Sequence, residues 1–302
     1  MDKTDFFLVK TLSMNSRLTY RELADMTGMS VSAVHKRIRA LEDDEVIHTY
    51  TARPSFFALK YLLVIIFGTS TVKSIDTVNK ELGQHESIYY VVNAGGKYLY
   101  ISAFIRDLTE LQEFGSYVSK TALISEPTIG IVNQYLSFPI AKLTHTSIPE
   151  PLTTIDYKIL KTLNRDSRKS ITDIVDDVGI SAKTVRKRLD RMRENALVTF
   201  SIEWTAHKVS FVTTFNVYLN EGTDINSTVQ HLYQKYSENV AYCITYSNIP
   251  NFLTVHTWAE TARESQKIQE ELQTEGFKDV IPHILLSGNY YECWLDQMLR
   301  SK

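Results

Sequence analysis

The sequence is poor in the features that mark several protein classes. Its two cysteines, Cys243 and Cys293, form no pair or cluster with metal-ligand spacing, and we expect free thiols in a reducing cytoplasm. Only 7 residues are Pro and 11 are Gly, so a disordered chain is not expected. Residues 1–5 lack the pattern of a signal peptide. The most apolar stretch, residues 61–67, is far shorter than the roughly 20 residues of a membrane helix.

Net charge is also nearly absent, at −2 for the whole chain. Such a small balance neither favours nor excludes nucleic acid as a partner, because the local position of the charges decides. The length of 302 residues is too great for one typical core, so two or more domains are expected.

The chain repeats itself at an offset of 151 residues. Residues 5–12 match residues 156–163 at Asp, Lys, Thr and Leu. The same offset, without a gap, aligns Ser16 with Ser167, Arg17 with Arg168, Asp25 with Asp176, Gly28 with Gly179, Ser30 with Ser181, Val34 with Val185, Lys36 with Lys187 and Arg37 with Arg188. Chance rarely places so many matches at one offset, so a tandem duplication is predicted.

The rest of each half repeats more faintly, as strand, helix, two strands, helix and strand. The expected ranges are 61–69, 74–83, 87–93, 98–104, 108–120 and 127–134 in the first half, and 211–219, 225–237, 240–246, 252–258, 261–274 and 283–290 in the second. This order is the ferredoxin-like βαββαβ pattern. The expected fold class is therefore α+β: two winged helix-turn-helix domains (1–54 and 153–208), two ferredoxin-like domains (58–136 and 209–300) and a Pro-containing linker (137–152).

Each helical segment has the pattern of a helix-turn-helix. Gly28 and Gly179 lie where a second short helix must stop, since Gly allows the left-handed conformation of a tight turn. Ser30 and Ser181 follow as N-caps of a third helix. Residues 46–50 and 197–201 then read as short strands that can form the wing.

The third helices, residues 30–42 and 181–193, are the candidate recognition helices. Val34, Ile38 and Leu41 in the first, and Val185, Leu189 and Met192 in the second, define the faces that should be buried. Such a helix lies in the major groove of double-stranded DNA, with basic residues further along it holding phosphates. The candidate DNA-binding residues are Ser30, Ser32, His35, Lys36, Arg37, Arg39, Ser181, Lys183, Thr184, Arg186, Lys187, Arg188 and Arg191. The alternative is a basic face that is merely solvated.

The two helix-turn-helix segments differ in charge. Residues 1–50 contain seven Lys/Arg and eight Asp/Glu, whereas residues 155–208 contain twelve and eight. The second segment is therefore predicted to supply most of the salt-dependent affinity for DNA.

Residues 5–54 resemble the Lrp/AsnC family of prokaryotic and archaeal regulators. The likeness is carried by residues 15–24 (NSRLTYRELA), 28–41 (GMSVSAVHKRIRAL) and 46–47 (VI), and it returns less strongly in the second half. The βαββαβ segments are similar in order and length to that family's RAM domain. Family members usually have one copy, and they have Gly where this chain has Glu45 and Ala196.

The resemblance also implies an amino-acid effector site in the hairpin of the RAM domain, built on a Gly-x-x-Asp pattern. The candidate residues here are Gly95, Gly96 and Tyr98, with Tyr98 in the place of the Asp. The second half, at residues 247–251, keeps neither residue of the pattern. The alternative is that Gly95 and Gly96 simply form a hairpin turn.

The strand at residues 61–67 is apolar at every position, which indicates burial on both faces. Helices cover only one face of a ferredoxin-like sheet, so another sheet is expected on the other. Either the two halves pair within one chain as a pseudo-dimer, or two chains pair as a homodimer. A stable monomer in light scattering would exclude the second arrangement.

Two other functions compete with transcription regulation. Siroheme decarboxylases resemble this family, and they use a motif like His-Asn-Tyr-x-Arg in the sheet domain. Residues 87–93 and 239–245 lack that motif, and no catalytic residue set, metal site or cofactor loop is visible. We therefore expect no enzyme, cofactor or metal. The third possibility is an interaction scaffold whose helix-turn-helix segments no longer touch DNA.

Overall fold

The computed structural model describes residues 1–136, 151–207 and 210–302, so most of the predicted linker lies outside the described residues. The chain divides into two compact units. Of the described residues, the sheet unit contains 1–3, 62–136, 206–207 and 210–291, and the helix-turn-helix unit contains 4–61, 151–205 and 292–302. No helix among the described residues is long and apolar enough to span a membrane.

The helix-turn-helix unit contains two groups of three helices. Their bounds are α1 Lys3–Met14, α2 Tyr20–Thr27 and α3 Val31–Asp43, and α7 Thr154–Leu163, α8 Ile171–Val178 and α9 Ala182–Glu194. The predicted turn chemistry is confirmed in both. Gly28 and Gly179 end α2 and α8 with φ of 67° and 73°, a region that L side chains rarely adopt. Ser30 and Ser181 cap α3 and α9 by accepting a backbone N–H.

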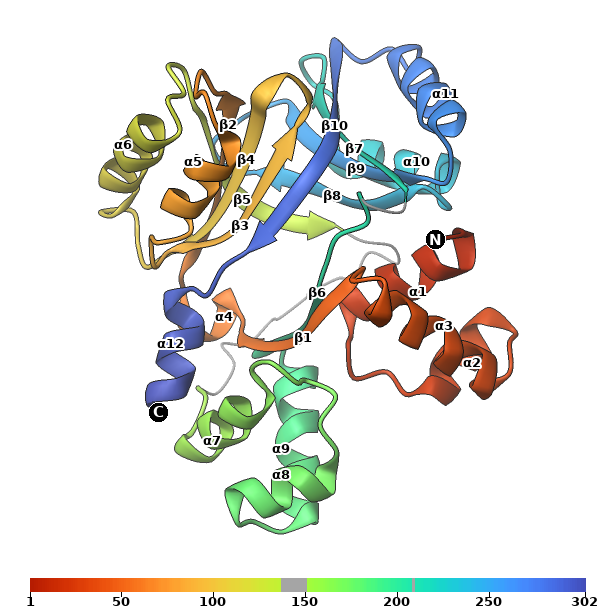
Figure 1. Ribbon diagram of the computed structural model, residues 1–302, viewed down its shortest axis with the longest axis vertical. Helices are drawn as coiled ribbons and strands as arrows, with labels where there is room; N and C mark the ends of the chain where they lie inside the picture. The colour runs from red at the N-terminus through yellow and green to blue at the C-terminus, as the bar shows by residue number, and fades with distance from the viewer. Residues whose placement is uncertain (137–150, 208–209) are drawn as a thin grey trace. The chain divides into compact units, whose positions relative to one another are not determined.

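A two-stranded sheet joins these groups. Strand β1 (Ile47–Pro54) pairs antiparallel with β6 (Val198–Trp204), with Thr51 opposite Ser201. Figure 1 shows the two strands between the helix groups. The sequence predicted both strands, at residues 46–50 and 197–201, but a few residues too short at their ends. It did not predict that each strand satisfies its backbone N–H and C=O groups with the strand of the other half.

The sheet unit is one closed barrel, with strand order β10-β3-β4-β2-β5-β8-β9-β7. The elements of the first half are β2 Leu62–Thr69, α5 Ile75–Leu82, β3 Ile88–Ala94, the single turn η1 Gly95–Lys97, β4 Tyr98–Ile105, α6 Leu111–Thr121 and β5 Thr128–Leu136. Those of the second half are β7 Phe211–Tyr218, α10 Ile225–Lys235, β8 Val240–Tyr246, β9 Phe252–Ala259, α11 Ala262–Gln273 and β10 Asp279–Tyr290. Both halves have the predicted βαββαβ order.

Two long strands close the barrel by crossing from one sheet to the other (Figure 1). β10 pairs with β7 through residues 279–284 and with β3 through residues 285–290. β5 pairs with β2 and then with β8. The sheets of the two halves are therefore joined within one chain.

The apolar strand β2 is buried on both faces, as its sequence predicted. Val64 and Ile66 pack in the core covered by helices α5 and α6, whereas Ile65 and Phe67 face the barrel interior. All four are at most 4% exposed. Because adjacent strand residues point to opposite faces, one continuous apolar run supplies two cores.

The C-terminal helix α12 (Trp294–Ser301) belongs to the helix-turn-helix unit, although the sequence assigned residues 209–300 to the second sheet domain. Leu299 is fully buried in the core that includes Leu160 and Leu163. A short helix, α4 (Phe56–Leu59), follows β1 in the same unit.

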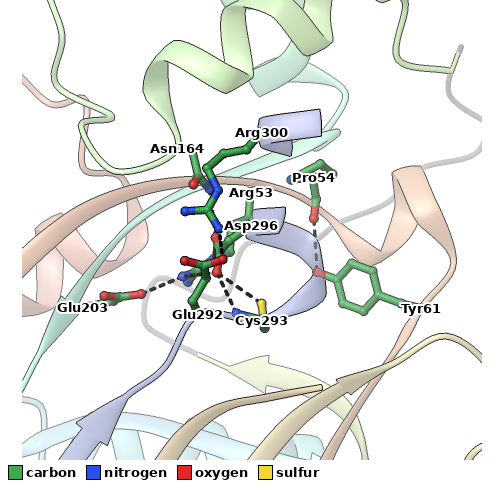
Figure 2. A network of polar contacts seen from close by, with 9 residues as sticks. All are labelled: Arg53, Pro54, Tyr61, Asn164, Glu203, Glu292, Cys293, Asp296 and Arg300. Atoms are coloured by element: carbon green, nitrogen blue, oxygen red, sulfur yellow. Dashed lines mark hydrogen bonds and ion pairs between the residues drawn. The ribbon is translucent and has the colours of Figure 1, made fainter. Parts of the chain in front are cut away.

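A buried network of polar side chains anchors α12 (Figure 2). The Arg53 guanidinium donates to both carboxylate oxygens of Asp296, at 2.8 and 3.2 Å, and to Glu203 at 2.6 Å. Asn164 also donates to Asp296, at 2.9 Å. The backbone N–H and the thiol of Cys293 donate to the other carboxylate oxygen of Asp296. The network thus ties α12 to both halves.

Burial alone would raise the pKa of Asp296, but the charge of Arg53 and the hydrogen bonds to the carboxylate hold it below the usual value. The lowered pKa means that this contribution to stability is present above the ordinary pKa of Asp. It is lost as pH falls through the lowered value. Burial and the neighbouring Asp296 raise the pKa of the Cys293 thiol to about 12. Cys293 and Cys243 are both buried and free of disulfides.

Replacing Arg53 should destabilise the helix-turn-helix unit. Arg53→Met leaves two buried carboxylates without their cation, which we expect to cost about 3–5 kcal/mol in the free energy of unfolding. The control is Arg39→Met, since the Arg39–Glu42 pair is exposed and should be worth about 0–1 kcal/mol. Chemical denaturation measures both variants. Equal losses in the two would show that the network does not anchor the helix.

Candidate nucleic-acid interface

The second recognition helix, α9, has one buried and one basic face. Val185 and Met192 are 0% exposed and Leu189 is 7% exposed, as predicted. Lys183, Arg186 and Lys187 are exposed on the helix. Ser181 caps the helix by accepting from the Thr184 N–H at 3.1 Å, and its hydroxyl lies 2.9 Å from that of Thr184. Packing thus fixes the helix while leaving these three cations, and Arg193 in its last turn, in solvent.

The first recognition helix, α3, has the same construction with fewer cations. Val34, Ile38 and Leu41 are buried, and the candidate residues Ser30, Ser32, His35, Lys36 and Arg39 are exposed. Arg39 pairs with Glu42 across 3.4 Å. The exposed face of α3 therefore carries less net positive charge than that of α9.

Three of the candidate arginines form ion pairs that join the third helix of a group to its first helix. Arg37 donates to Asp5 at 2.7 Å in the first group. Arg188 lies 3.7 Å from the buried carboxylate of Asp156, and Arg191 donates to that carboxylate at 2.6 Å. Asp5 and Asp156 occupy matching positions in the repeat, as do Arg37 and Arg188. The repeat therefore preserved a pair that locks the third helix to the first.

A contact between the two halves lies beside the β1–β6 sheet. The hydroxyls of Ser16 and Ser167 are 2.5 Å apart, and both residues are 0% exposed. Arg17 donates to the backbone oxygen of Ser167 at 2.6 Å, and Arg168 donates to that of Ser16 at 2.9 Å. The halves exchange the same bonds, as in a two-fold symmetric interface. We call these four residues the serine–arginine joint.

The repeat in the sequence aligns the residues of this joint but assigns them no role. A small polar residue followed by Arg, identical in both copies, was the available signal. Identity at matching positions cannot reveal that the two copies contact each other, because it fits equally well with two separate sites.

The candidate effector residues lie at the β3–β4 hairpin of the sheet unit. Gly95 and Gly96 are exposed in the turn, and Gly96 has φ of 69°, which favours Gly there. Tyr98 stacks on His283 with ring centroids 3.8 Å apart, and its hydroxyl accepts a hydrogen bond from Asn216. The fold itself thus accounts for both the glycines and the tyrosine of the pattern.

Two half-buried histidines of the sheet unit also have structural partners. His256 lies 2.8 Å from the Thr214 hydroxyl, and burial lowers its pKa to about 3. Burial also lowers the pKa of His283, to about 4. Both are therefore neutral at pH 7, as expected of histidines packed inside a barrel.

Loss of the internal arginine pairs should reduce stability, whereas loss of an exposed neighbour should not. Arg37→Gln and Arg191→Gln should each cost about 1.5–3 kcal/mol, because each removes a charged hydrogen bond to a shielded carboxylate. Lys36→Gln and Lys187→Gln, on the same helices, are the matched controls and should stay close to wild type. Denaturant titration of the four variants measures the difference. If the arginine variants match their lysine controls, the pairs do not lock the helices.

Two family models match this chain. Winged helix-turn-helix DNA-binding matches residues 1–48, and the AsnC-type helix-turn-helix domain matches residues 152–193. Among curated relatives, an uncharacterized HTH-type transcriptional regulator of Pyrococcus furiosus is 34% identical over 116 residues, which cover 37% of this chain and 78% of the relative. The HTH-type transcriptional regulator LrpA of Pyrococcus horikoshii is 30% identical, covering 37% and 82%.

Among solved structures, siroheme decarboxylase NirDL aligns with 99% of this chain and 98% of its own, with a TM-score of 0.61. At 10% identity, this likeness shows the shared fold alone. The sequence relatives carry the assignment. Together with the two matched domains, they show that this chain belongs to the Lrp/AsnC family of helix-turn-helix transcriptional regulators.

Proposed function

We propose that one chain binds double-stranded DNA with both recognition helices, α3 and α9, in the major groove, and thereby regulates transcription. The observation that carries this proposal is the pairing of the two helix groups. β1–β6 pairing and the serine–arginine joint hold both recognition helices in one unit. Two recognition helices held in one unit can bind the two half-sites of a roughly palindromic operator.

The arginine pairs change which side chains we assign to DNA. Arg37, Arg188 and Arg191 are engaged with Asp5 and Asp156, so we assign them to helix packing. Residues that remain exposed on the outer faces are the better candidates for DNA contacts. They are Ser32, His35, Lys36 and Arg39 on α3, and Lys183, Arg186 and Lys187 on α9.

We assign the sheet unit to assembly of the two halves. Its closed barrel already joins both copies within one chain, so a second chain is not needed to complete it. The contacts of Tyr98 with His283 and Asn216 favour a structural role for that residue over an amino-acid effector site.

The direct test is a genomic pull-down of DNA bound to the purified full chain. We expect enrichment of defined, roughly palindromic promoter sites over input DNA. No enrichment would contradict DNA-based regulation and leave the interaction scaffold as the better account. A porphyrin absorption band in the purified protein would point instead to an enzyme related to the siroheme decarboxylases.

The second recognition helix, α9, should supply most of the salt-dependent part of the affinity for DNA. Neutralising Lys183, Arg186 and Lys187 with Gln should lower the salt slope of the binding constant by about 0.9 for each DNA phosphate that is no longer neutralised. The matched variant Lys36→Gln/Arg39→Gln in the first half should lower the slope less. Fluorescence anisotropy at several salt concentrations measures both slopes. An unchanged slope in the first variant would contradict the unequal roles of the two helices.

A further inference from the structure

The helix-turn-helix unit contains a surface hollow of about 210 Å³ between elements of the two halves. Asn15 and Arg17 reach it from the segment between α1 and α2, and the second half supplies the other walls. Apolar groups form one part of its lining, and charged groups form the other. The lining from the second half consists of Ile171, Arg186, Leu189, Asp190, Arg193 and Phe200.

The equivalent place in the first half is occupied by aromatic side chains. The backbone oxygens of Tyr50 and Phe200 accept from the N–H groups of Ser167 and Ser16, so these two residues are equivalent in space. The Arg168 guanidinium lies over the rings of Tyr20, at 4.7 Å, and Tyr50, at 5.4 Å.

The repeat shows how this place differs between the two halves. The Tyr20 ring also packs against His35, with ring centroids 5.0 Å apart. In the repeat, Tyr20 aligns with the smaller Ile171. The exchange of Tyr for Ile removes one of the two rings beneath the arginine, while Phe200 keeps the other beneath Arg17, 6.0 Å from its guanidinium. A cavity lined by polar groups is one that a polar ligand or water can occupy.

The charges around the hollow are mostly positive. Arg17, Arg186 and Arg193 face a single acid, Asp190, which pairs with Arg193 across 3.2 Å. Burial, followed by the positive charges of Arg168 and Arg193, lowers the pKa of Arg17, although the group stays protonated at neutral pH. In the first half, Glu42 takes the place of Arg193 and accepts from the Tyr50 hydroxyl at 2.7 Å.

Arg17 is fixed by bonds that use only part of its donor capacity. The bonds of its guanidinium to the backbone oxygens of Ser167 and Lys169 both start from Nη1. A guanidinium carries five N–H donors in a planar fork that suits carboxylates and phosphates. A preorganised arginine of this kind is well placed to bind an oxyanion without a further loss of side-chain entropy.

We propose that this hollow binds a small organic dianion, free in solution, that carries carboxylate or phosphate groups. Three arginines against one aspartate favour a ligand with two negative charges, and Ile171, Leu189 and Phe200 suit its carbon skeleton. The volume is below the ~300–1,000 Å³ of pockets for drug-sized ligands, so a nucleotide is too large. The binding claim does not depend on the function proposed above.

Ligand binding in the hollow should also change the affinity of the chain for DNA. This second claim rests on the proposed function. The ligand contacts Arg17 of the joint and Arg186 of the recognition helix at once. Because it neutralises Arg186 and occupies the side of α9, ligand binding lowers the affinity for DNA. The hollow thus makes the second half the regulated one.

The binding test uses the full chain without DNA and isothermal titration calorimetry. Probes are inorganic phosphate, glycerol 3-phosphate and succinate, each at an ionic strength held constant with chloride. We expect saturable binding of at least one organic probe. Arg193→Gln should weaken that binding about tenfold, because it removes one charged hydrogen-bond donor. Lys183→Gln, which removes a charge from the same helix outside the hollow, is the matched control and should bind as wild type does.

A second variant tests whether binding needs the open space of the hollow as well as the charge of its arginines. Ile171→Tyr copies the first half and fills the hollow while keeping all three arginines, so it should abolish binding. Circular dichroism checks that each variant is folded. If Ile171→Tyr does not fold, Arg193→Gln and its control decide. Absence of saturable binding, or equal binding by wild type and Arg193→Gln, would overturn the proposal.

A separate experiment distinguishes a free anion from a phosphate of the DNA backbone as the occupant of the hollow. If none of the probes binds but Arg193→Gln lowers the salt slope of DNA binding, the hollow holds a DNA backbone phosphate, and the free-ligand proposal is wrong. If a probe binds and DNA binding proves absent, the proposed function fails while the site stands. If a probe binds but leaves DNA affinity unchanged, the regulatory consequence is wrong.

Discussion

The serine–arginine joint is the buried polar contact that, together with the β1–β6 sheet, sets the geometry of the helix-turn-helix unit. Ser16 and Ser167 face each other with no exposed surface, and each donates its backbone N–H to the strand of the other half. Arg17 and Arg168 then use the backbone oxygens of those serines. A polar group that is buried without a partner costs free energy, so every group in this joint requires the opposite copy. This requirement and the β1–β6 pairing together hold α3 and α9 in one unit.

Duplication within one chain releases the two halves from the identity that a homodimer imposes. In a symmetric dimer, a change on one recognition helix appears on both. Here α9 keeps four exposed cations, whereas α3 carries fewer and has acidic neighbours. Tyr20 packs against Arg168 in the first half, and Ile171 leaves space beside Arg17 in the second. Common architecture with unequal side chains allows one half to be the stronger electrostatic contact and the site of a ligand.

Much of this fold was predictable because its signals are local. Apolar periodicity predicted the twelve strands and helices of the sheet unit to within a few residues, and Gly28, Ser30 and their repeats predicted the helix-turn-helix caps. What failed depends on partners distant in sequence. β1 pairs with β6 of the other half, and Asp296 of α12 binds Arg53, which is 243 residues away in the sequence. Arg188 has the appearance of a DNA contact until Asp156 is found beside it. Charge pattern gives the face of a helix, but not which charges are already paired.

The central claim is that one chain supplies both halves of a two-fold DNA-binding unit. It is tested most directly by the mass of the complex with a single palindromic operator duplex, measured by analytical ultracentrifugation. If both recognition helices of one chain bind the operator, we expect one chain per duplex, with both half-sites protected from nuclease. Two chains per duplex, each protecting one half-site, would contradict it, because the second recognition helix of each chain would then have no place on the operator.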